Sequence, residues 1–325
     1  MLPVVPVALN LRFYFFGMPI EDTRIILRPA DVRRSGKQED LQIDLTDPSE
    51  SSHDTAGYLS AILRILKRFQ RGFRAKGLKL YARSEIPIGA GMGSSGALEV
   101  AFLTALNRFF SLGLTNDSIA EYSYLAESFD LGIPCGRLDQ YAATFGGAIV
   151  LHQRPIISVE RLKLPPFSMV VIDSGEQHRT EAIHSVRQAE IDEGLAACQS
   201  SSMVPKSFKN RLGRTHFETD WENINRDELA RFLFMVPEKS GKRILFTIQM
   251  NDSTKLIVDF LKAGKIERKT ALEVLGERRF KILDSSNWAV LETIGETMNL
   301  QHELLRDLYD VSTDKLEILR DLSLM

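Results

Sequence analysis

Residues 86–100 read IPIGAGMGSSGALEV and place four glycines and two adjacent serines in one short stretch. The residues before it, GLKLYARSEIP (77–87), alternate between apolar and polar types as in a half-buried strand. The apolar residues after it recur at helical spacing from Ala97 to Phe109, and Gly113 follows as a helix stop. The glycine loop is therefore predicted to lie between a strand and the N-terminus of a helix.

A glycine loop at a helix N-terminus presents unpaired backbone N–H groups and the positive end of the helix dipole, which favours a phosphate group. The loop is not a Walker A motif, because no Gly-Lys-Ser/Thr closes it. Gly91, Gly93 and Gly96 do satisfy the dinucleotide pattern G-x-G-x-x-G. The acidic partner that this pattern needs would be Asp117, which follows a helix and a turn. A dinucleotide-binding oxidoreductase stays open as an alternative.

The composition of the 325-residue chain narrows the class of protein. With 44% hydrophobic residues, the chain is long enough for two ordinary domains. Its net charge of −2 and the lack of a long run of one sign indicate neither a nucleic-acid nor a membrane partner. Only Cys135 and Cys198 are present, which favours a reducing compartment. No apolar run reaches the ~20 residues of a membrane span, and no signal peptide is recognisable. We expect a cytoplasmic monomer or dimer.

The rest of the chain predicts a strand-rich first half and a helix-rich second half, with a domain boundary at Pro165 and Pro166. The segment LPVVPVALNLRFYFFG (2–17) suits a strand interrupted by Pro3 and Pro6. Further strands are predicted at 24–27, 41–44, 146–151 and, in FSMVVIDSG, at 167–175. Helices are predicted at 55–69, 115–129, 180–197, 227–234, 251–261, 269–275 and 288–308.

Pro87 and the serine pair have no role in a dinucleotide loop, but residues 87–97, PIGAGMGSSGA, resemble the phosphate-binding motif of the GHMP kinases. This superfamily is named for galactokinase, homoserine kinase, mevalonate kinase and phosphomevalonate kinase. The resemblance implies that loop amides bind ATP while a serine hydroxyl ligates Mg²⁺ and caps the helix. An ordinary helix start after a glycine turn is the alternative. The residues placed at ATP are Pro87, Gly89, Gly91, Met92, Gly93, Ser94, Ser95, Gly96 and Ala97, with Ser95 on the metal.

A second stretch, ESFDLGIPCGRLDQ (127–140), resembles the galactokinase segment that ends in Cys-Gly-Ile-Met-Asp-Gln. The resemblance implies that Glu127 ligates Mg²⁺ and that Asp139 is the catalytic base. Phosphoryl transfer to a hydroxyl needs both roles, because one carboxylate binds the metal and another accepts or orients the proton of the attacking group. On composition alone, Asp139 would be a helix cap or a surface acid.

Arg137 departs from the galactokinase pattern, which has an apolar residue there. In this respect DQYAATFGG (139–147) is closer to the heptose-phosphate kinases of the same superfamily, which carry a cation. A cation two residues from Asp139 can stabilise its ionised form or bind an anionic substrate. Pairing with a surface acid is the other explanation. Gly136, Arg137 and Asp139 are therefore candidate substrate-binding residues.

Two later segments, 169–190 and 298–321, also resemble galactokinases. His178, His184 and His302 lie within them, and we expect structural roles for all three. Galactokinases also carry Pro-Gly-Arg near the start and Gly-Ala-Gly-x-Gly-Gly near the end, and neither motif occurs here. We therefore expect a chain truncated at both ends, with little or no kinase activity of its own.

The resemblance implies an α+β, two-domain GHMP kinase fold. A ribosomal-protein-S5-like domain is expected over 1–165 and a ferredoxin-like domain over 166–325, with the active site between them and the first strand and the last loop and strands lacking. The implied reaction transfers the γ-phosphoryl group of ATP, with Mg²⁺, to the anomeric hydroxyl of galactose or a related small sugar. The alternatives are a kinase for a heptose phosphate or a uronic acid, and an inactive sensor of sugar and ATP.

Overall fold

The computed structural model describes residues 2–29, 40–48, 53–73, 76–176 and 180–324. The chain forms two compact units. The N-terminal unit is Pro6–Ile149, and the C-terminal unit combines Met1–Val5 with Val150–Met325. The domain boundary expected after residue 165 stays a prediction.

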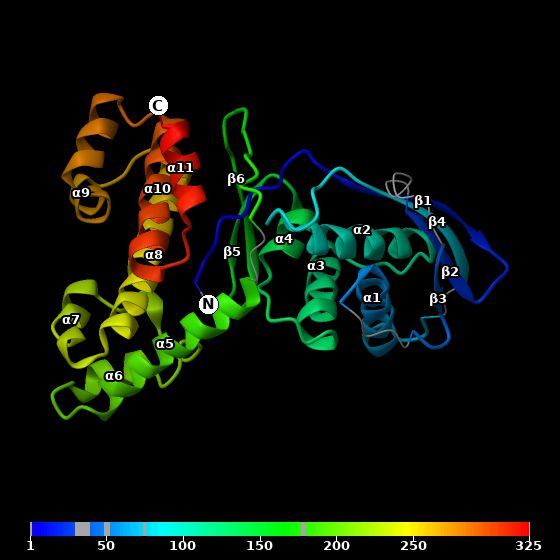
Figure 1. The fold of residues 1–325 in the computed structure, drawn as a ribbon, viewed down its shortest axis with the longest axis horizontal. Helices are drawn as coiled ribbons and strands as arrows, with labels where there is room; N and C mark the ends of the chain where they lie inside the picture. The colour runs from blue at the N-terminus through cyan, green and yellow to red at the C-terminus, as the bar shows by residue number, and fades with distance from the viewer. Residues whose placement is uncertain (1, 30–39, 49–52, 74–75, 177–179, 325) are drawn as a thin grey trace. The chain divides into compact units, whose positions relative to one another are not determined.

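The N-terminal unit is built on a four-stranded mixed sheet (Figure 1). Its strands are β1 (Phe13–Ile20), β2 (Arg24–Pro29), β3 (Leu41–Asp44) and β4 (Gly77–Ser84), in the order β1-β4-β2-β3. β2 runs parallel to β4, and the other two pairings are antiparallel. Along β1 the side chains alternate, because Phe13 and Phe15 pack on the core whereas Phe16 and Met18 are exposed. One face of the sheet is therefore covered and the other is not.

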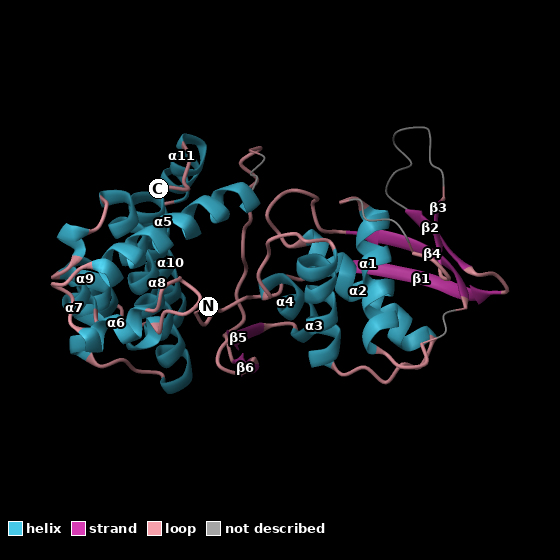
Figure 2. Cartoon of the chain, turned by 90° about the horizontal axis from the view of Figure 1, so that it is seen from below, coloured by secondary structure: helices cyan, strands magenta, loops and turns pink. Residues whose placement is uncertain are grey.

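Helices of the N-terminal unit gather beside the covered face of this sheet (Figure 2). They are α1 (Thr55–Phe69), α2 (Ser94–Phe109), α3 (Asn116–Leu125) and α4 (Leu138–Phe145). Asp54 caps α1 by accepting the N–H of Gly57 at 3.0 Å. Leu59 and Ile62 of α1 and Leu80 of β4 are fully buried, and each such side chain contributes roughly 2 kcal/mol. α2 contributes to this apolar layer, and the candidate site lies at the start of α2 and in α4.

A π-helical turn, η2 (Ala126–Asp130), continues directly from α3. The N–H of Leu131 donates to the carbonyl oxygen of Ala126 at 3.0 Å, five residues back. Such turns insert one extra residue into a helix and are frequent at functional sites. Glu127 lies in this turn and is buried.

The C-terminal unit is mainly helical. β5 (Ala148–His152), whose first two residues belong to the N-terminal unit, pairs with β6 (Ser158–Leu162). One core surrounds Leu195, Phe208 and Ile244, and a smaller one surrounds Leu256 and Leu283. The helices are α5 (Thr180–Ser200), α6 (Lys206–Leu212), η3 (Trp221–Asn223), α7 (Arg226–Ala230), η4 (Leu233–Met235), α8 (Glu238–Ala263), α9 (Arg268–Ser285), α10 (Val290–Leu304), η5 (Leu305–Tyr309) and α11 (Asp314–Ser323).

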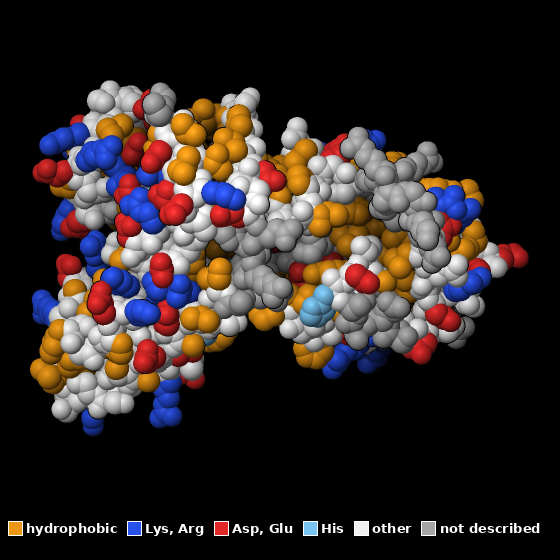
Figure 3. Space-filling model, viewed as in Figure 1, with side chains coloured by type: hydrophobic (Ala, Val, Ile, Leu, Met, Phe, Trp, Pro, Cys, Tyr) orange, Lys and Arg blue, Asp and Glu red, His pale blue; other side chains and the backbone are white. Residues whose placement is uncertain are grey.

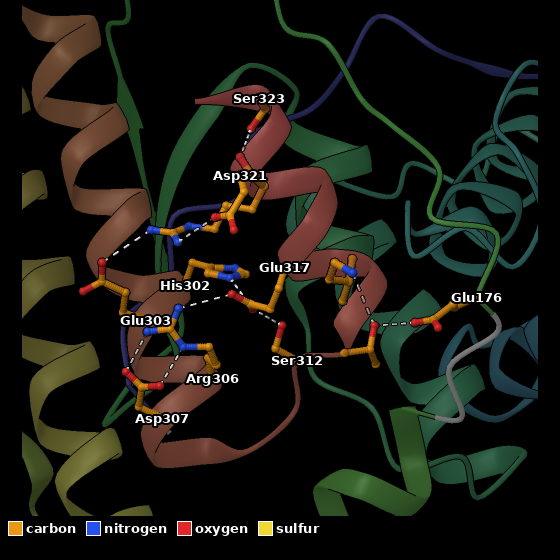
Figure 4. A network of polar contacts seen from close by, with 12 residues as sticks. Glu176, His302, Glu303, Arg306, Asp307, Ser312, Glu317, Asp321 and Ser323 are labelled. Carbon is orange, nitrogen blue, oxygen red and sulfur yellow. Dashed lines mark hydrogen bonds and ion pairs between the residues drawn. The ribbon is translucent and has the colours of Figure 1, made fainter. Parts of the chain in front are cut away.

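A polar network joins α11 to the end of α10 (Figure 4). Glu317 accepts hydrogen bonds from Nε2 of His302 at 2.8 Å and from Nη1 of Arg306 at 3.2 Å, and also from the hydroxyl of Ser312. These donors, Ser312 foremost, lower the pKa of Glu317 to about 2. His302 therefore has the structural role expected for it, whereas His178 lies outside the described residues.

The surface of the C-terminal unit carries basic and acidic side chains interspersed with one another on the face shown in Figure 3. Among the helices of the described residues, none has both the length and the hydropathy that a membrane span requires.

The α+β class is confirmed, and many predicted elements are found within a few residues of their expected ends. Three are not: the strand expected over 2–17 is Phe13–Ile20, with isolated bridges at Val4 and Val7, the helix expected at 251–261 begins at Glu238, and the helix expected at 269–275 extends to Ser285. The strand predicted at 167–175 is wrong. Residues 163–176 have no regular structure, Val170 is 83% exposed, and within the described part of the chain no strand pairs with this segment. Its β-branched residues favour a strand, but a strand also needs a hydrogen-bonded neighbour. The described part of 166–325 is helical, and the ferredoxin-like sheet expected there stays a prediction.

Candidate active site

The glycine loop lies between β4, which ends at Ser84, and α2, which begins at Ser94, as the sequence predicts. Gly89, Gly91 and Gly93 have φ angles of 75°, 69° and 66°. These left-handed angles strain any residue that carries a β-carbon. Three glycines at alternate positions therefore shape the turn that leads into α2.

The N-terminus of α2 has no side-chain cap, so the predicted serine cap is wrong. Gly93 is the N-cap residue, and the first intrahelical bond runs from the N–H of Ala97 to the carbonyl oxygen of Gly93 at 3.0 Å. The N–H groups that precede this bond, those of Ser94, Ser95 and Gly96, have no intrahelical acceptor. With the helix dipole, they form an end suited to an anion.

Asp139, in the first turn of α4, packs directly on this helix start. A β-carbon built on Gly93 would lie 2.9 Å from the carboxyl carbon of Asp139. A β-carbon on Gly96 would lie 2.8 Å from Cβ of Asp139 and 3.1 Å from the backbone nitrogen of Gln140. Real β-carbons do not approach other atoms this closely, so glycine is required at both positions for α4 to sit here. The structure thus brings the predicted catalytic carboxyl to the predicted phosphate loop.

Glu127 meets Ser95, so the two residues predicted to ligate Mg²⁺ lie together. Burial raises the pKa of Glu127, and the neighbouring Ser95 side chain opposes this by lowering that pKa. Oε2 of Glu127 accepts from Nε2 of Gln140 at 2.5 Å, and the hydroxyl of Tyr58 is 3.5 Å from Oε1. The side chain of Cys135 also lowers the pKa of Glu127 and is therefore nearby. Glu127 is thereby held from several directions.

Glu99 belongs to the same cluster and was not predicted from the sequence. It follows Ser95 by one turn of α2, and its Oε2 accepts from Nε2 of Gln140 at 3.1 Å. Burial, followed by the nearby charges of Glu127 and Asp139, raises the pKa of Glu99 well above its ordinary value of 4.5. The i, i+4 spacing from Ser95 could have identified it, because residues at that spacing share one helix face.

Burial also raises the pKa of Asp139 above its ordinary 3.8. The Cys135 thiol is affected in the same way, because burial and the charge of Glu127 raise its pKa. The three carboxyls of Glu99, Glu127 and Asp139 therefore form a desolvated acidic cluster. Such a cluster favours a proton or a cation as its counter-charge.

The donor set fits a magnesium ion that arrives with a nucleotide. Mg²⁺ commonly uses one or two protein oxygens, with waters and phosphate oxygens completing an octahedron. Ser95 and Glu127 would supply those two oxygens. In the part of the chain that the structure describes, no three His, Cys, Asp or Glu side chains converge on a self-sufficient metal site. A metal shared with phosphate oxygens is the kind that these residues suit.

Arg137 is engaged in helix packing. Its Nε and Nη2 donate to the two carboxylate oxygens of Glu121, each at 2.8 Å, and its guanidinium carbon lies 4.0 Å from the ring centre of Tyr124. Tyr141 donates to the same Glu121 at 3.1 Å. The pKa of Asp139 is shifted by burial, not by Arg137. Of the explanations for this cation, pairing with an acid is the one that the geometry matches.

The remaining predicted residues surround the loop or lie near α4. Pro87, Gly89 and Gly91 are exposed, Met92 and Ala97 are half-buried, and Gly136 is exposed just before α4. Asp117 lies exposed in the first turn of α3 and not at the end of a strand. The acidic partner of a dinucleotide fingerprint is therefore not provided by Asp117.

Comparison with known proteins agrees with this geometry. Residues 58–147 match the family described as the GHMP kinases N terminal domain, and this range contains the loop, Glu127 and Asp139. The chain is 27% identical over 277 residues to galactokinase of Thermosipho africanus. This alignment covers 84% of this chain and 65% of that protein. It is 25% identical over 326 residues to galactokinase of Thermotoga maritima. This alignment covers 98% of this chain and 75% of that protein.

Solved structures show the same fold. The galactokinase of Lactococcus lactis complexed with galactose aligns with a TM-score of 0.74 at 20% identity, over 99% of this chain and 74% of that one. The mevalonate kinase of Methanococcus jannaschii aligns with a TM-score of 0.54 at 16% identity, over 99% and 77% of the two chains. The chain thus spans roughly two thirds to three quarters of the length of these relatives. Residues 58–147 thus match the GHMP kinases N terminal domain, and the chain as a whole is similar to galactokinases.

Proposed function

We propose that this protein is an ATP-dependent sugar kinase that transfers the γ-phosphoryl group of ATP to the anomeric hydroxyl of galactose or a close relative. The observation that carries the proposal is the contact of Asp139 with Gly93 and Gly96 at the start of α2. This contact places a carboxyl group that can accept a proton beside a helix N-terminus that can bind an anion. The named relatives of the chain are galactokinases, which favours galactose as the acceptor.

In the proposed reaction, N–H groups of the glycine loop and of Ser94–Gly96 hold the phosphates. Ser95 and Glu127 hold the magnesium ion, which neutralises charge on the triphosphate. The Asp139 carboxylate accepts the proton of the sugar hydroxyl as its oxygen bonds to the γ-phosphorus and the bond to ADP breaks. A pKa raised by burial brings this carboxyl closer to the pH at which such a transfer is efficient.

Two assays on the purified chain test this proposal. Calorimetry measures binding of ATP with Mg²⁺, with NAD as the control for the dinucleotide alternative. A coupled assay for ADP release then compares galactose, glucose, galacturonate and a heptose phosphate. We expect binding of Mg²⁺–ATP but not NAD, and the turnover, which is expected to be low for this chain, should be highest on galactose. A chain that does not bind Mg²⁺–ATP, or that binds NAD instead, contradicts the proposal.

The two alternatives predict different results in the same assays. A kinase for an anionic sugar would act best on galacturonate or the heptose phosphate, but the engagement of Arg137 with Glu121 and Tyr124 argues against it. A sensor would bind ATP and galactose without releasing ADP. The raised pKa of Asp139, in contact with the phosphate loop, favours catalysis over sensing.

A further inference from the structure

We propose that Gln140 and Glu99 form a buried positioning pair, which fixes the carboxylate of Glu127 beside Ser95 so that the metal-bound nucleotide of the proposed function is held. The inference rests on that function and adds two residues to it. Neither residue touches the substrates in this scheme. Both act through Glu127, so they are positioning residues.

The amide of Gln140 bridges two carboxyl groups. Its Nε2 donates to Oε2 of Glu127 at 2.5 Å and to Oε2 of Glu99 at 3.1 Å, which engages both of its hydrogens. Glu99 and Gln140 are fully buried, and Glu127 is 6% exposed. A buried side chain with two hydrogen bonds has one rotamer available, so Gln140 cannot turn without losing both. Because Gln140 is held in one orientation, the Glu127 carboxylate that accepts its hydrogen bond is held in place as well.

Glu99 is the anchored end of the series of contacts that runs from Glu99 through Gln140 to Glu127. It lies on α2 between Leu98 and Val100, which belong to the apolar core of the N-terminal unit, one turn after Ser95. Ser95 and Glu99 therefore share one rigid helix. Through Gln140, Glu99 holds Glu127 at a set distance from the Ser95 hydroxyl. The helix thus positions one proposed metal ligand directly and the other through an amide.

This arrangement costs stability, which argues for a role beyond packing. A carboxyl buried without a cation is unfavourable, and an apolar residue at 99 would pack without that penalty. Among the described residues, no arginine or lysine is found to influence the pKa of Glu99. Oε1 of Glu99 and Oε1 of Gln140 are also buried without a hydrogen-bond partner in the described structure. Proteins commonly keep a side chain that orients a metal ligand even when burying it lowers the stability. Removing such a side chain lowers the affinity for the metal about 10–100-fold.

Gln140 also stands next to Asp139 in the first turn of α4. The two side chains meet different neighbours, because Asp139 packs on Gly93 and Gly96 whereas Gln140 reaches Glu99 and Glu127. The same helix turn is therefore anchored on both sides. Replacing Glu99 is therefore expected to disturb the orientation of Glu127 while leaving the contact of Asp139 with Gly93 and Gly96 in place.

The test measures metal affinity and not turnover. Mn²⁺ is titrated into each protein with saturating ADP and followed by electron paramagnetic resonance, and ADP binding is measured separately in EDTA. The variants are Glu99→Leu, Glu99→Gln, Gln140→Leu and the double variant Glu99→Leu/Gln140→Leu. The control is Asn107→Leu, which removes hydrogen bonds from the Asn107 side chain on the same helix to the backbone of Leu114.

We expect Glu99→Leu to weaken Mn²⁺ binding about 10-fold or more, with ADP binding in EDTA unchanged. Glu99→Gln keeps an acceptor for the Gln140 amide and should restore the affinity to within about threefold of wild type. The double variant should match Gln140→Leu alone, because Glu99 acts only through Gln140. Asn107→Leu should lower the melting temperature without changing Mn²⁺ affinity.

Two different results overturn the inference and can be told apart. If Glu99→Leu only destabilises the protein, as Asn107→Leu does, and Mn²⁺ affinity is unchanged, the pair has a structural role and the proposed function is unaffected. If wild-type protein shows no metal-dependent binding of ADP, the proposed function fails, and the positioning role fails with it.

Discussion

Asp139 lies against Gly93 so closely that a β-carbon on the glycine would stand 2.9 Å from the carboxyl carbon. This contact joins two features that are far apart in the sequence, a turn in front of α2 and the first residues of α4. Because the contact involves the carboxyl group itself, the loop sets where the proposed base stands. Changes in the glycines are therefore expected to act on Asp139 as well as on the loop.

Gly96→Ala should destabilise the protein although it lies in a helix, where alanine is ordinarily favoured by about 1 kcal/mol. The added β-carbon would meet backbone atoms of Asp139 and Gln140 that cannot move aside. We expect a loss of about 1–3 kcal/mol in urea denaturation. Gly295→Ala is the matched control, because a β-carbon on this helical glycine has nothing within 4 Å. Stabilisation by both substitutions would mean that α4 does not pack on α2 as described.

Asp139→Asn should lower turnover about 10²–10⁴-fold and leave binding of Mg²⁺–ATP in place, because the amide keeps the shape but cannot accept the proton. Asp117→Asn, on the exposed first turn of α3, is the control and should keep full turnover. A steady-state comparison of the two variants decides the point. Equal turnover in wild type and Asp139→Asn would exclude a proton-accepting role.

The same substitution predicts a pH effect on stability. The pKa of Asp139 is raised by burial, so the folded state holds its proton more tightly than the unfolded state does. The stabilising contribution of the neutral carboxyl is complete below pH 3.8 and is lost as the pH rises through the folded-state pKa. Asp139→Asn should therefore be more stable than wild type at pH 7 and similar to it near pH 3. Urea denaturation at both pH values measures this, and an equal difference at both would contradict it.

Arg137→Ala should destabilise the N-terminal unit without weakening sugar binding. It removes two hydrogen bonds to Glu121 and the stacking on Tyr124, for which we expect a loss of about 2 kcal/mol. Glu121→Gln should lose part of the same energy, and the double variant should lose less than the sum. A rise in the dissociation constant for galactose with unchanged stability would instead assign Arg137 to the substrate.

Glu317→Gln should destabilise the C-terminal unit at neutral pH but not at pH 2. Hydrogen bonds from Ser312, Arg306 and His302 lower the pKa of Glu317 to about 2. Because the pKa of Glu317 is lower in the folded state than its ordinary value of 4.5, the ionised carboxylate stabilises the folded state above pH 4.5. This stabilisation is lost as the pH falls through the folded-state pKa of about 2. Because the Glu317 side chain is 26% exposed, the effect should be at most about 1 kcal/mol. Thermal unfolding of both proteins from pH 7 to pH 2 checks the convergence.

Val170→Lys should reduce self-association with little effect on stability. Val170 is 83% exposed in a segment without regular structure, together with Val171 and Ile172. Exposed β-branched residues with unpaired backbone groups are a risk for intermolecular strand pairing. Light scattering at rising concentration measures the change, and surface substitutions of this kind alter stability by about 0.5 kcal/mol or less. A large loss of stability would show that Val170 is packed.

The strand–loop–helix arrangement around the glycines could be predicted because local chemistry determines it. Positive φ angles at Gly89, Gly91 and Gly93 require glycine, and the apolar spacing after Ala97 gives the helix. The placement of Asp139 followed from its motif and not from any spacing rule. Its contact with Gly96 depends on how α2 and α4 pack, which a single sequence does not show.

The predictions that failed, or were missed, depended on partners far away in the sequence. Residues 167–175 have strand propensity, but a strand forms only where another strand offers hydrogen bonds. Ser95 was expected to cap α2, but its side chain lies near Glu127, which belongs to a different element. Glu99 was overlooked because a glutamate within a helical pattern is ordinarily exposed. In each case, tertiary contacts decided against the local preference.

The π-helical turn that carries Glu127 has a consequence for how this chain can be altered. Such a turn contains one residue more than an α-helix needs, and each residue advances a helix by about 100°. Deleting Ala126 would let α3 continue as a regular α-helix and would turn the residues after it, Glu127 first among them, by about 100° relative to α3. Shortening by one residue, which a surface helix could tolerate, would here move a proposed metal ligand while the rest of the N-terminal unit keeps its fold.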